Sequence, residues 1–296
     1  MLHEKLIGTG VALVTPFKTD GSVDYEALGK LVDFQIENET DYLVVCGTTS
    51  EVPTLEQTER EMIINCVVER VAGKIPVVAG MGGYNTARIV KRVSTANNFG
   101  INAVLSVVPY YNKPSQEGIY QHFKAIATAT DMPIILYNVP GRTGANMTAQ
   151  TTLRLANEFK NIVAVKEASG NFQQIDEIIK NKPQNFMVIS GDDGITFPLI
   201  TLGAVGVISV IGNAFPREIS RMVRLALRGD LAGAREIHYR FTELMELLFI
   251  DGNPAGVKSM LSEMGMIENI LRLPLVPTTI ATKEKIRKIL CEIKKL

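Results

Sequence analysis

The sequence predicts an α/β fold, a closed (β/α)8 barrel followed by an all-helical C-terminal extension. Short β-branched runs recur along the chain, and most end roughly thirty residues after the previous one, about the length of one strand–helix unit. The segments between the runs carry helical periodicity. No GxGxxG motif follows the first run, which counts against a doubly wound dinucleotide-binding sheet. A TIM barrel is therefore the expected architecture.

The bulk composition fits this fold and narrows the classes of function. A length of 296 residues is ordinary for such a barrel with an appendage, and the 46% apolar content is that of a globular protein. The 31 basic and 31 acidic residues cancel and form no basic block, so we expect no nucleic-acid partner. The first residues show no secretory signal pattern, and no apolar run approaches the roughly 20 residues of a membrane span.

The cysteines bear on the compartment. Cys46, Cys66 and Cys291 lie far apart and show no metal-ligand spacing. We therefore expect a reducing, cytoplasmic environment, with no metal and no membrane association.

Eight runs are the expected strands, because each is rich in β-branched residues and is closed by Gly, Pro or a polar residue. They are Gly10–Val14, Tyr42–Cys46, Pro76–Ala79, Ala103–Val107, Ile134–Tyr137, Ile162–Lys166, Met187–Ser190 and Val205–Val210.

The segments between the strands show amphipathic helices with start signals. Ser115 and Thr148 each stand where a helix cap is expected, whereas His122 and His238 fall at positions that indicate exposed helix surfaces. The expected buried stripes are Leu28, Leu31, Val32 and Gln35 in Asp24–Glu37, and Met62, Ile63, Cys66 and Val67 in Glu56–Val71.

The chain divides near Gly229. Residues 1–229 are the expected catalytic barrel, and residues 230–296 are the expected helical extension. Helices are predicted over Leu231–Phe249, Pro254–Met264 and Lys283–Lys294, with Pro274 and Pro277 as breaks. No flexible linker separates the two parts, so we expect the extension to pack on the barrel or on a neighbouring subunit.

Residues that break the apolar pattern cluster where the strands end. In parallel barrels these ends converge on one rim, where catalytic residues gather. The segments are Gly47–Glu51, Gly80–Gly83, Pro109–Asn112, Tyr137–Gly144, Lys166–Glu167 and Gly191–Asp193.

Lys166 and Tyr137 are the strongest indication of an enzyme. Lys166 closes an apolar strand, and burial of a lysine favours the neutral amine that attacks a ketone to form a Schiff base. Tyr137 closes the preceding strand 29 residues upstream, one unit earlier on the same rim. Two structural alternatives stay open: Lys166 could be an ion-pair partner of Glu167 or Asp192, and Tyr137 could be a core residue with a satisfied hydroxyl.

Other rim residues have both a structural and a functional interpretation. Thr48 and Thr49 could belong to an ordinary turn, or could present hydroxyls and backbone N–H groups to a carboxylate. Arg142 could be a solvated loop charge, or a bidentate carboxylate clamp. Asp192 and Asp193 do not predict a metal site, because adjacent carboxylates point in different directions and no further ligand is evident.

Taken together, the motifs resemble a known family. GTTSE, PYYNKPSQEGIYQHF, YNVPGRTG, VAVKEASGN, ISGDD and GVISV are similar to the 4-hydroxy-tetrahydrodipicolinate (dihydrodipicolinate) synthase family of pyruvate-dependent class I aldolases and lyases. The similarity runs from about Gly8 to the C-terminus. It implies condensation of pyruvate with L-aspartate 4-semialdehyde in lysine and diaminopimelate biosynthesis.

The resemblance also implies roles for the rim residues. Lys166 would form a covalent imine with pyruvate, with no separate cofactor. Tyr137 would transfer protons, in a relay completed by Thr48 and by Tyr111 from an adjacent subunit of a homotetramer. The substrate-binding residues would be Thr49 for the pyruvate carboxylate, Arg142 for the semialdehyde carboxylate, and Gly191 and Ile208 for the pyruvate pocket.

The chain departs from the family pattern at two places. Ser50 stands where the family usually has glycine, which a loop of this kind should tolerate. Lysine-inhibited relatives carry two histidines and a glutamate where this chain has Gln57, Arg60 and Arg88. Because arginine repels a cationic ligand, weak or absent inhibition by lysine is expected.

Two other functions remain as alternatives. The nearer one is an N-acetylneuraminate lyase or a 2-keto-3-deoxy-sugar aldolase, which would keep the lysine and the tyrosine but bind long polyhydroxylated partners. The remote one is a non-catalytic, ligand-binding barrel. Arg142 and Tyr111 favour a short carboxylated aldehyde instead.

Overall fold

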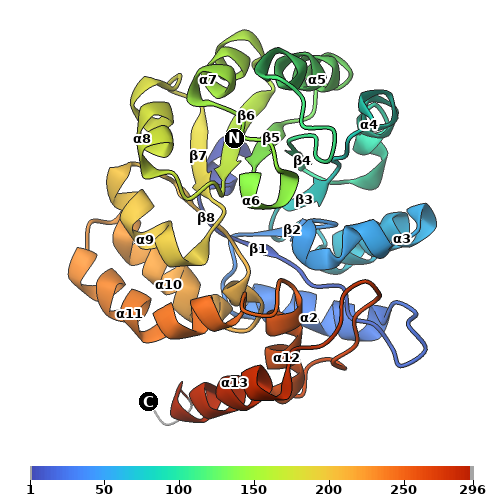
Figure 1. Ribbon diagram of the computed structural model, residues 1–296, viewed down its shortest axis with the longest axis vertical. Helices are drawn as coiled ribbons and strands as arrows, with labels where there is room; N and C mark the ends of the chain where they lie inside the picture. The colour runs from blue at the N-terminus through green and yellow to red at the C-terminus, as the bar shows by residue number, and fades with distance from the viewer. Residues whose placement is uncertain (1, 294–296) are drawn as a thin grey trace.

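The computed structural model describes residues 2–293 and has eight parallel strands in a closed barrel, with β1 paired to both β2 and β8. Figure 1 shows the strands at the centre and helices around them. The strands are β1 (Gly8–Ala12), β2 (Tyr42–Val45), β3 (Val77–Gly80), β4 (Ala103–Val107), β5 (Ile134–Asn138), β6 (Ile162–Glu167), β7 (Met187–Ser190) and β8 (Gly206–Ser209). The (β/α)8 prediction is confirmed.

A helix follows each strand and covers the outside of the barrel. These helices are α2 (Tyr25–Glu37), α3 (Gln57–Val71), α4 (Thr86–Val93), α5 (Gln116–Thr128), α7 (Ala149–Glu158), α8 (Phe172–Asn181), α9 (Asp193–Leu202) and α10 (Pro216–Leu227). The predicted caps are confirmed, since the Ser115 and Thr148 side chains accept backbone hydrogen bonds at the starts of α5 and α7. Two short helices, α1 (Leu2–Lys5) and α6 (Pro140–Thr143), lie outside this repeat.

Two details of the helix prediction were wrong. Met62 is 53% exposed, because the buried face of α3 lies about one position further along and is formed by Ile63, Ile64, Val67 and Val71. His122 is buried, with its Nδ1 2.9 Å from the Thr86 hydroxyl. The neighbouring helix α4 packs against α5 and covers it, which the periodicity of a single helix cannot reveal.

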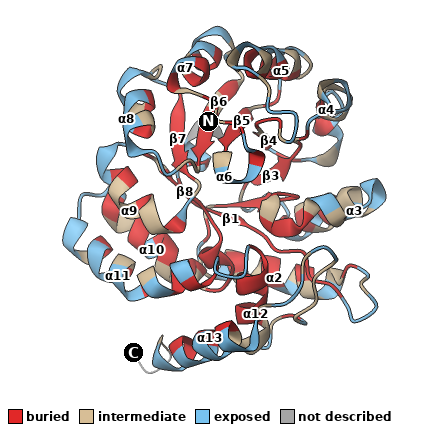
Figure 2. Ribbon diagram, in the orientation of Figure 1, coloured by how far each residue is buried: buried red, intermediate tan, exposed pale blue. Residues whose placement is uncertain are grey.

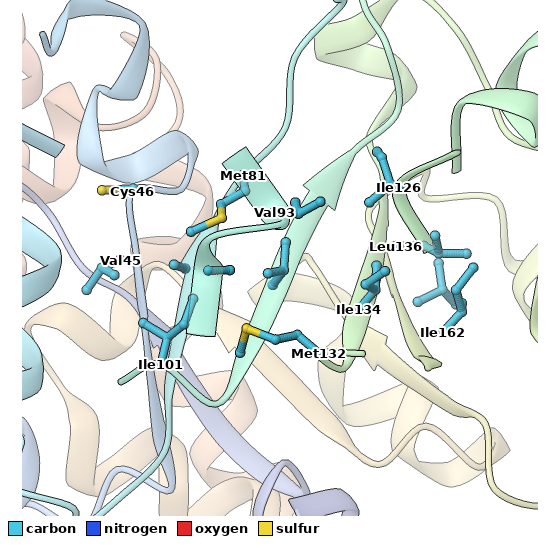
Figure 3. Packing of buried hydrophobic residues seen from close by; sticks show 14 of the residues in the cluster. Val45, Cys46, Met81, Val93, Ile101, Ile126, Met132, Ile134, Leu136 and Ile162 are labelled. Atoms are coloured by element: carbon cyan, nitrogen blue, oxygen red, sulfur yellow. The ribbon is translucent and has the colours of Figure 1, made fainter. Parts of the chain in front are cut away.

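Side chains alternate between an inner and an outer apolar cluster along each strand. Figure 2 shows the strands buried along nearly all of their length, and Figure 3 shows Val45, Leu136 and Ile162 in the outer cluster. On β6, Val165 lies in the outer cluster and Ala164 in the inner one, so Lys166 faces the barrel interior. Burying each such Val, Leu or Ile contributes about 1.5–3 kcal/mol, which favours one register over a one-residue slip.

The C-terminal extension consists of helices, as predicted. They are α11 (Leu231–Leu247), α12 (Ala255–Glu263) and α13 (Ile280–Ile293). Helix α11 packs on α9 and α10, and α12 packs on α13, which lies at the lower edge of the molecule in Figure 1. One apolar cluster joins the barrel helix α10 to all three. The division of the chain at residues 229 and 230 stays a prediction.

None of the helices within residues 2–293 combines the length and the apolar character that crossing a bilayer requires.

Candidate active site

Lys166 and Tyr137 lie side by side inside the barrel. The register of β5 and β6 pairs the two residues directly, and Lys166 Nζ lies 4.4 Å from the centre of the Tyr137 ring. Both side chains are buried, with Lys166 only 5% exposed. An amine and a phenol are thus held together at the end of two neighbouring strands.

The two carboxylates named above as candidate partners of Lys166 make hydrogen bonds to other groups. Glu167 points to the outside of the barrel, where Asn138 Nδ2 donates to its Oε1 at 2.8 Å. Asp192 caps α9, accepting a hydrogen bond from Gly194 N at 2.9 Å. No ion pair of Lys166 is found in the part of the chain that the structure describes. The structure therefore does not favour the alternative in which Lys166 forms a structural ion pair with Glu167 or Asp192.

Gly191 allows the close approach of the Lys166 side chain. A Cβ atom at Gly191 would lie 2.9 Å from Lys166 Cε and 2.7 Å from Ala168 Cβ, so a larger residue would displace the lysine. Ile208, on β8, belongs to the same inner apolar cluster as Tyr137. Both predicted pocket residues therefore lie inside the barrel near the pair.

A cavity of about 360 Å³ opens at this rim, a volume within the roughly 300–1,000 Å³ typical of small-molecule sites. Thr48, Tyr137 and Arg142 line it together, from three different loops or strand ends. Lys166 does not form part of the wall itself; it adjoins the cavity through its contact with Tyr137. The structure thus brings these three residues together at one cavity, and their catalytic and binding roles stay predictions.

The loop of Thr48 is held by buried hydrogen bonds. Thr48 begins the 3-10 turn η1 (Thr48–Ser50), and Thr49 Oγ1 accepts a 3.1 Å hydrogen bond from Asn253 Nδ2. Ser50 Oγ donates to Leu13 O at 2.7 Å. The positive φ of this turn falls on Glu51, at 55°, rather than on Ser50. Serine is accommodated here because its hydroxyl has a partner and its backbone needs no glycine.

A buried ion pair behind this loop was missed by the sequence analysis. Lys258 Nζ lies 2.5 Å from Glu51 Oε1, and both side chains are fully buried. Lys258 also donates to Ile270 O at 2.8 Å, and Arg272 N donates to Glu51 Oε2 at 3.1 Å. Burial lowers the pKa of Lys258 to about 8. Its only sequence signal was a lysine on the apolar stripe of α12, and it does not line the cavity.

Some predicted residues lie apart from this cavity. Tyr111 is 87% exposed, has a φ of 69° and does not line the cavity. Gln57 and Arg88 are exposed, whereas Arg60 lines the cavity. Thr49 is buried against Asn253 and is not part of the wall, although its neighbour Thr48 is. The role of Tyr111 in a neighbouring subunit stays a prediction.

Comparison with known proteins places these features in a family context. Residues 5–293 match the model of the Dihydrodipicolinate synthetase family. A 4-hydroxy-tetrahydrodipicolinate synthase from Parabacteroides distasonis is 71% identical over 293 residues, which cover 99% of each chain. The corresponding synthase from Phocaeicola vulgatus is 66% identical over 294 residues, again 99% of each chain. The crystal structure of dihydrodipicolinate synthase from Aquifex aeolicus superposes with a TM-score of 0.95 at 47% identity and covers 98% of each chain.

Proposed function

This chain belongs to the dihydrodipicolinate synthetase family, and from that premise we propose that it condenses pyruvate with L-aspartate 4-semialdehyde to 4-hydroxy-tetrahydrodipicolinate. The single observation that carries the mechanism is the contact between Lys166 and Tyr137 on paired strands. The enzyme is a lyase of lysine and diaminopimelate biosynthesis. The names of the relatives favour this activity over an N-acetylneuraminate lyase or a sugar-acid aldolase.

The chemistry begins with attack of the neutral Lys166 amine on the ketone of pyruvate. Loss of water gives a protonated imine, which acts as an electron sink. Removal of a methyl proton then gives an enamine, whose carbon adds to the aldehyde carbon of the semialdehyde. The C=O π bond breaks, the aldehyde oxygen takes up a proton to become a hydroxyl, and the imine forms again. Release of Lys166 requires another amine to take over the imine carbon, and the semialdehyde carries one. No separate cofactor takes part in this scheme.

Proton transfer is assigned to Tyr137. Its ring lies beside the Lys166 amine and also lines the cavity, so its hydroxyl can serve groups on both sides. Thr48 lines the same cavity and is assigned the next position of the relay. Tyr111 completes the relay from the adjacent subunit, and its high exposure in the single chain fits a residue that serves a neighbour.

Substrate carboxylates are assigned to two other groups. Arg142 lines the cavity, and its planar guanidinium can bind the semialdehyde carboxylate through two hydrogen bonds. The pyruvate carboxylate is assigned, from the family resemblance, to Thr49 and the backbone beside it; Asn253 fixes the Thr49 side chain next to Thr48, which lines the cavity. Gly191 and Ile208 shape the pyruvate end. A site that needs Tyr111 from a neighbour is incomplete in one chain and requires at least a dimer. The resemblance to the family implies a homotetramer, which we place in the cytoplasm.

Borohydride trapping with pyruvate tests the imine. We expect reduction to fix pyruvate on the peptide that contains Lys166, detected by mass spectrometry, and the Lys166→Met variant to remain unmodified. Lys258 is a matched internal control, because it is also buried but is paired with Glu51 and lies outside the cavity wall. An adduct on Lys258, or none on the wild type, would support the non-catalytic barrel instead.

We predict little or no inhibition by lysine. Gln57, Arg60 and Arg88 supply no carboxylate for the ammonium of lysine, and the two arginines repel it. Initial rates measured with rising L-lysine should stay near the uninhibited rate, with sodium chloride added to equal ionic strength as the control. Half-inhibition by L-lysine at a sub-millimolar concentration would show that this prediction is wrong.

A further inference from the structure

The cavity has a positively charged wall beyond Tyr137. Among the described residues that line it, the charged ones are Arg60, Arg92, Arg142 and Glu51. The carboxylate of Glu51 is already neutralised by Lys258. Three arginines therefore line the cavity, and the one carboxylate among these described lining residues is already paired with Lys258. The cavity is thus positively charged, although the whole chain has no net charge.

Arg92 is the least satisfied of these charges. It stands half-buried in the last turn of α4, and its guanidinium makes no hydrogen bond or contact ion pair with any residue in 2–293. Burial lowers the pKa of Arg92, and the positive charges of Arg60 and Arg88 lower it further. An arginine withdrawn from water is normally paired, because an uncompensated charge is costly there.

Arg60 is fixed in place beside it. Its Nε and Nη2 both donate to the carbonyl oxygen of Leu55, at 3.0 and 2.8 Å, which holds the planar group while leaving its Nη1 hydrogens for another acceptor. Tyr110 lines the same wall, and burial raises the pKa of Tyr110, so its hydroxyl stays protonated.

A carboxylate outside the cavity wall acts on Arg92 without completing the site. Glu61 attracts Arg92 electrostatically, but the Oε1 of Glu61 accepts a 2.7 Å hydrogen bond from Gln57. Arg92, Tyr110 and the Nη1 hydrogens of Arg60 are therefore donors on this wall for which residues 2–293 supply no hydrogen-bond acceptor.

We propose that Arg60 and Arg92 form a binding subsite for a small oxyanion, a carboxylate or a phosphate, beside the reaction site and independent of Lys166. Two guanidinium groups bind such an anion through charge-assisted hydrogen bonds, for which arginine has the matching planar geometry. The subsite lies in the catalytic cavity but on different elements, at α3 and α4 rather than β5 and β6.

Binding of inorganic phosphate and of succinate, measured by isothermal titration calorimetry at constant ionic strength, tests this subsite. We expect saturable binding of at least one probe to the wild type, and at least tenfold weaker binding to Arg92→Gln. Lys91→Gln is the matched control, because it removes the same charge from the adjacent, exposed position of α4 and should leave the affinity unchanged. The subsite proposal is wrong if neither probe saturates, or if both variants lose binding equally.

Two further measurements separate binding from structural and catalytic roles. Without ligand, the Tm of Arg92→Gln should equal or exceed that of the wild type, because an unpaired half-buried charge has been removed; a lower Tm would mean that Arg92 has a structural partner. Enzyme whose Lys166 has been blocked by borohydride and pyruvate should still bind the probe. Loss of binding after blocking would assign the anion to the substrate site and overturn the independent subsite.

Discussion

Replacing Tyr137 by phenylalanine is expected to lower kcat by about 10²–10⁴-fold, the usual contribution of a positioned general acid–base. The phenylalanine ring preserves the packing in the inner cluster and the contact with Lys166, so the barrel and the site should keep their shape. Only the hydroxyl that moves protons during imine formation and enamine chemistry is lost. Steady-state kinetics with both substrates, together with thermal unfolding, measure the two effects.

Tyr42→Phe is the matched control for this variant. Tyr42 is also a buried tyrosine of the inner cluster, on β2, and within residues 2–293 its hydroxyl makes one long 3.5 Å hydrogen bond, to Val207 O. Its removal should leave kcat close to the wild-type value. Should Tyr137→Phe retain full kcat, or should both variants fall alike, the proton-transfer role of Tyr137 would have to be abandoned.

Replacing Lys258 by methionine is expected to destabilise the protein by about 3–5 kcal/mol, because it leaves the Glu51 carboxylate buried without its cation. Glu51 is also the residue that ends the Thr48–Ser50 turn, in a left-handed backbone conformation. Disturbing it should loosen the loop that holds these threonines, so KM for pyruvate should rise as stability falls. Urea unfolding at fixed protein concentration and steady-state kinetics measure the two effects.

The double variant Glu51→Gln with Lys258→Met distinguishes the pair from a simple packing defect. A neutral amide does not require a buried cation, so the double variant should be more stable than Lys258→Met alone. If Lys258→Met unfolds at the same urea concentration as the wild type, the pair contributes nothing to the loop. If the double variant is the less stable of the two, the packing of Lys258 rather than its charge is responsible.

The repeat of strand and helix could be predicted because each element has its own pattern of apolar and polar residues over a short stretch of sequence. Seven of the expected strands begin within a residue or so of the observed ones, whereas β1 begins at Gly8 rather than Gly10. Glycine has no side chain that would indicate a strand. Gly8 belongs to β1 because its backbone pairs with Gly206 of β8. The misplaced stripe of α3 and the buried His122 have the same origin, since burial depends on the neighbouring helices.

The candidate site was predictable only where it lies on the strands. The spacing of Tyr137 and Lys166 placed them on adjacent strands, and the regular unit of the barrel converted that spacing into a contact. Asn253 and Lys258 follow Thr49 and Glu51 by more than two hundred residues, at separations of 204 and 207. No local pattern links positions so far apart.

The sequence by itself determined the barrel, the order of its strands and the two residues of the expected chemistry, because these depend on short-range periodicity and on a repeat of nearly constant length. Only the tertiary structure decided how the extension braces the Thr48–Glu51 loop, and that Arg60 and Arg92 share a cavity with Tyr137. Both features depend on which charged side chains are buried together and which of them form an ion pair. That outcome is set by the packing of distant segments, since the cost of a buried charge is a property of its whole surroundings.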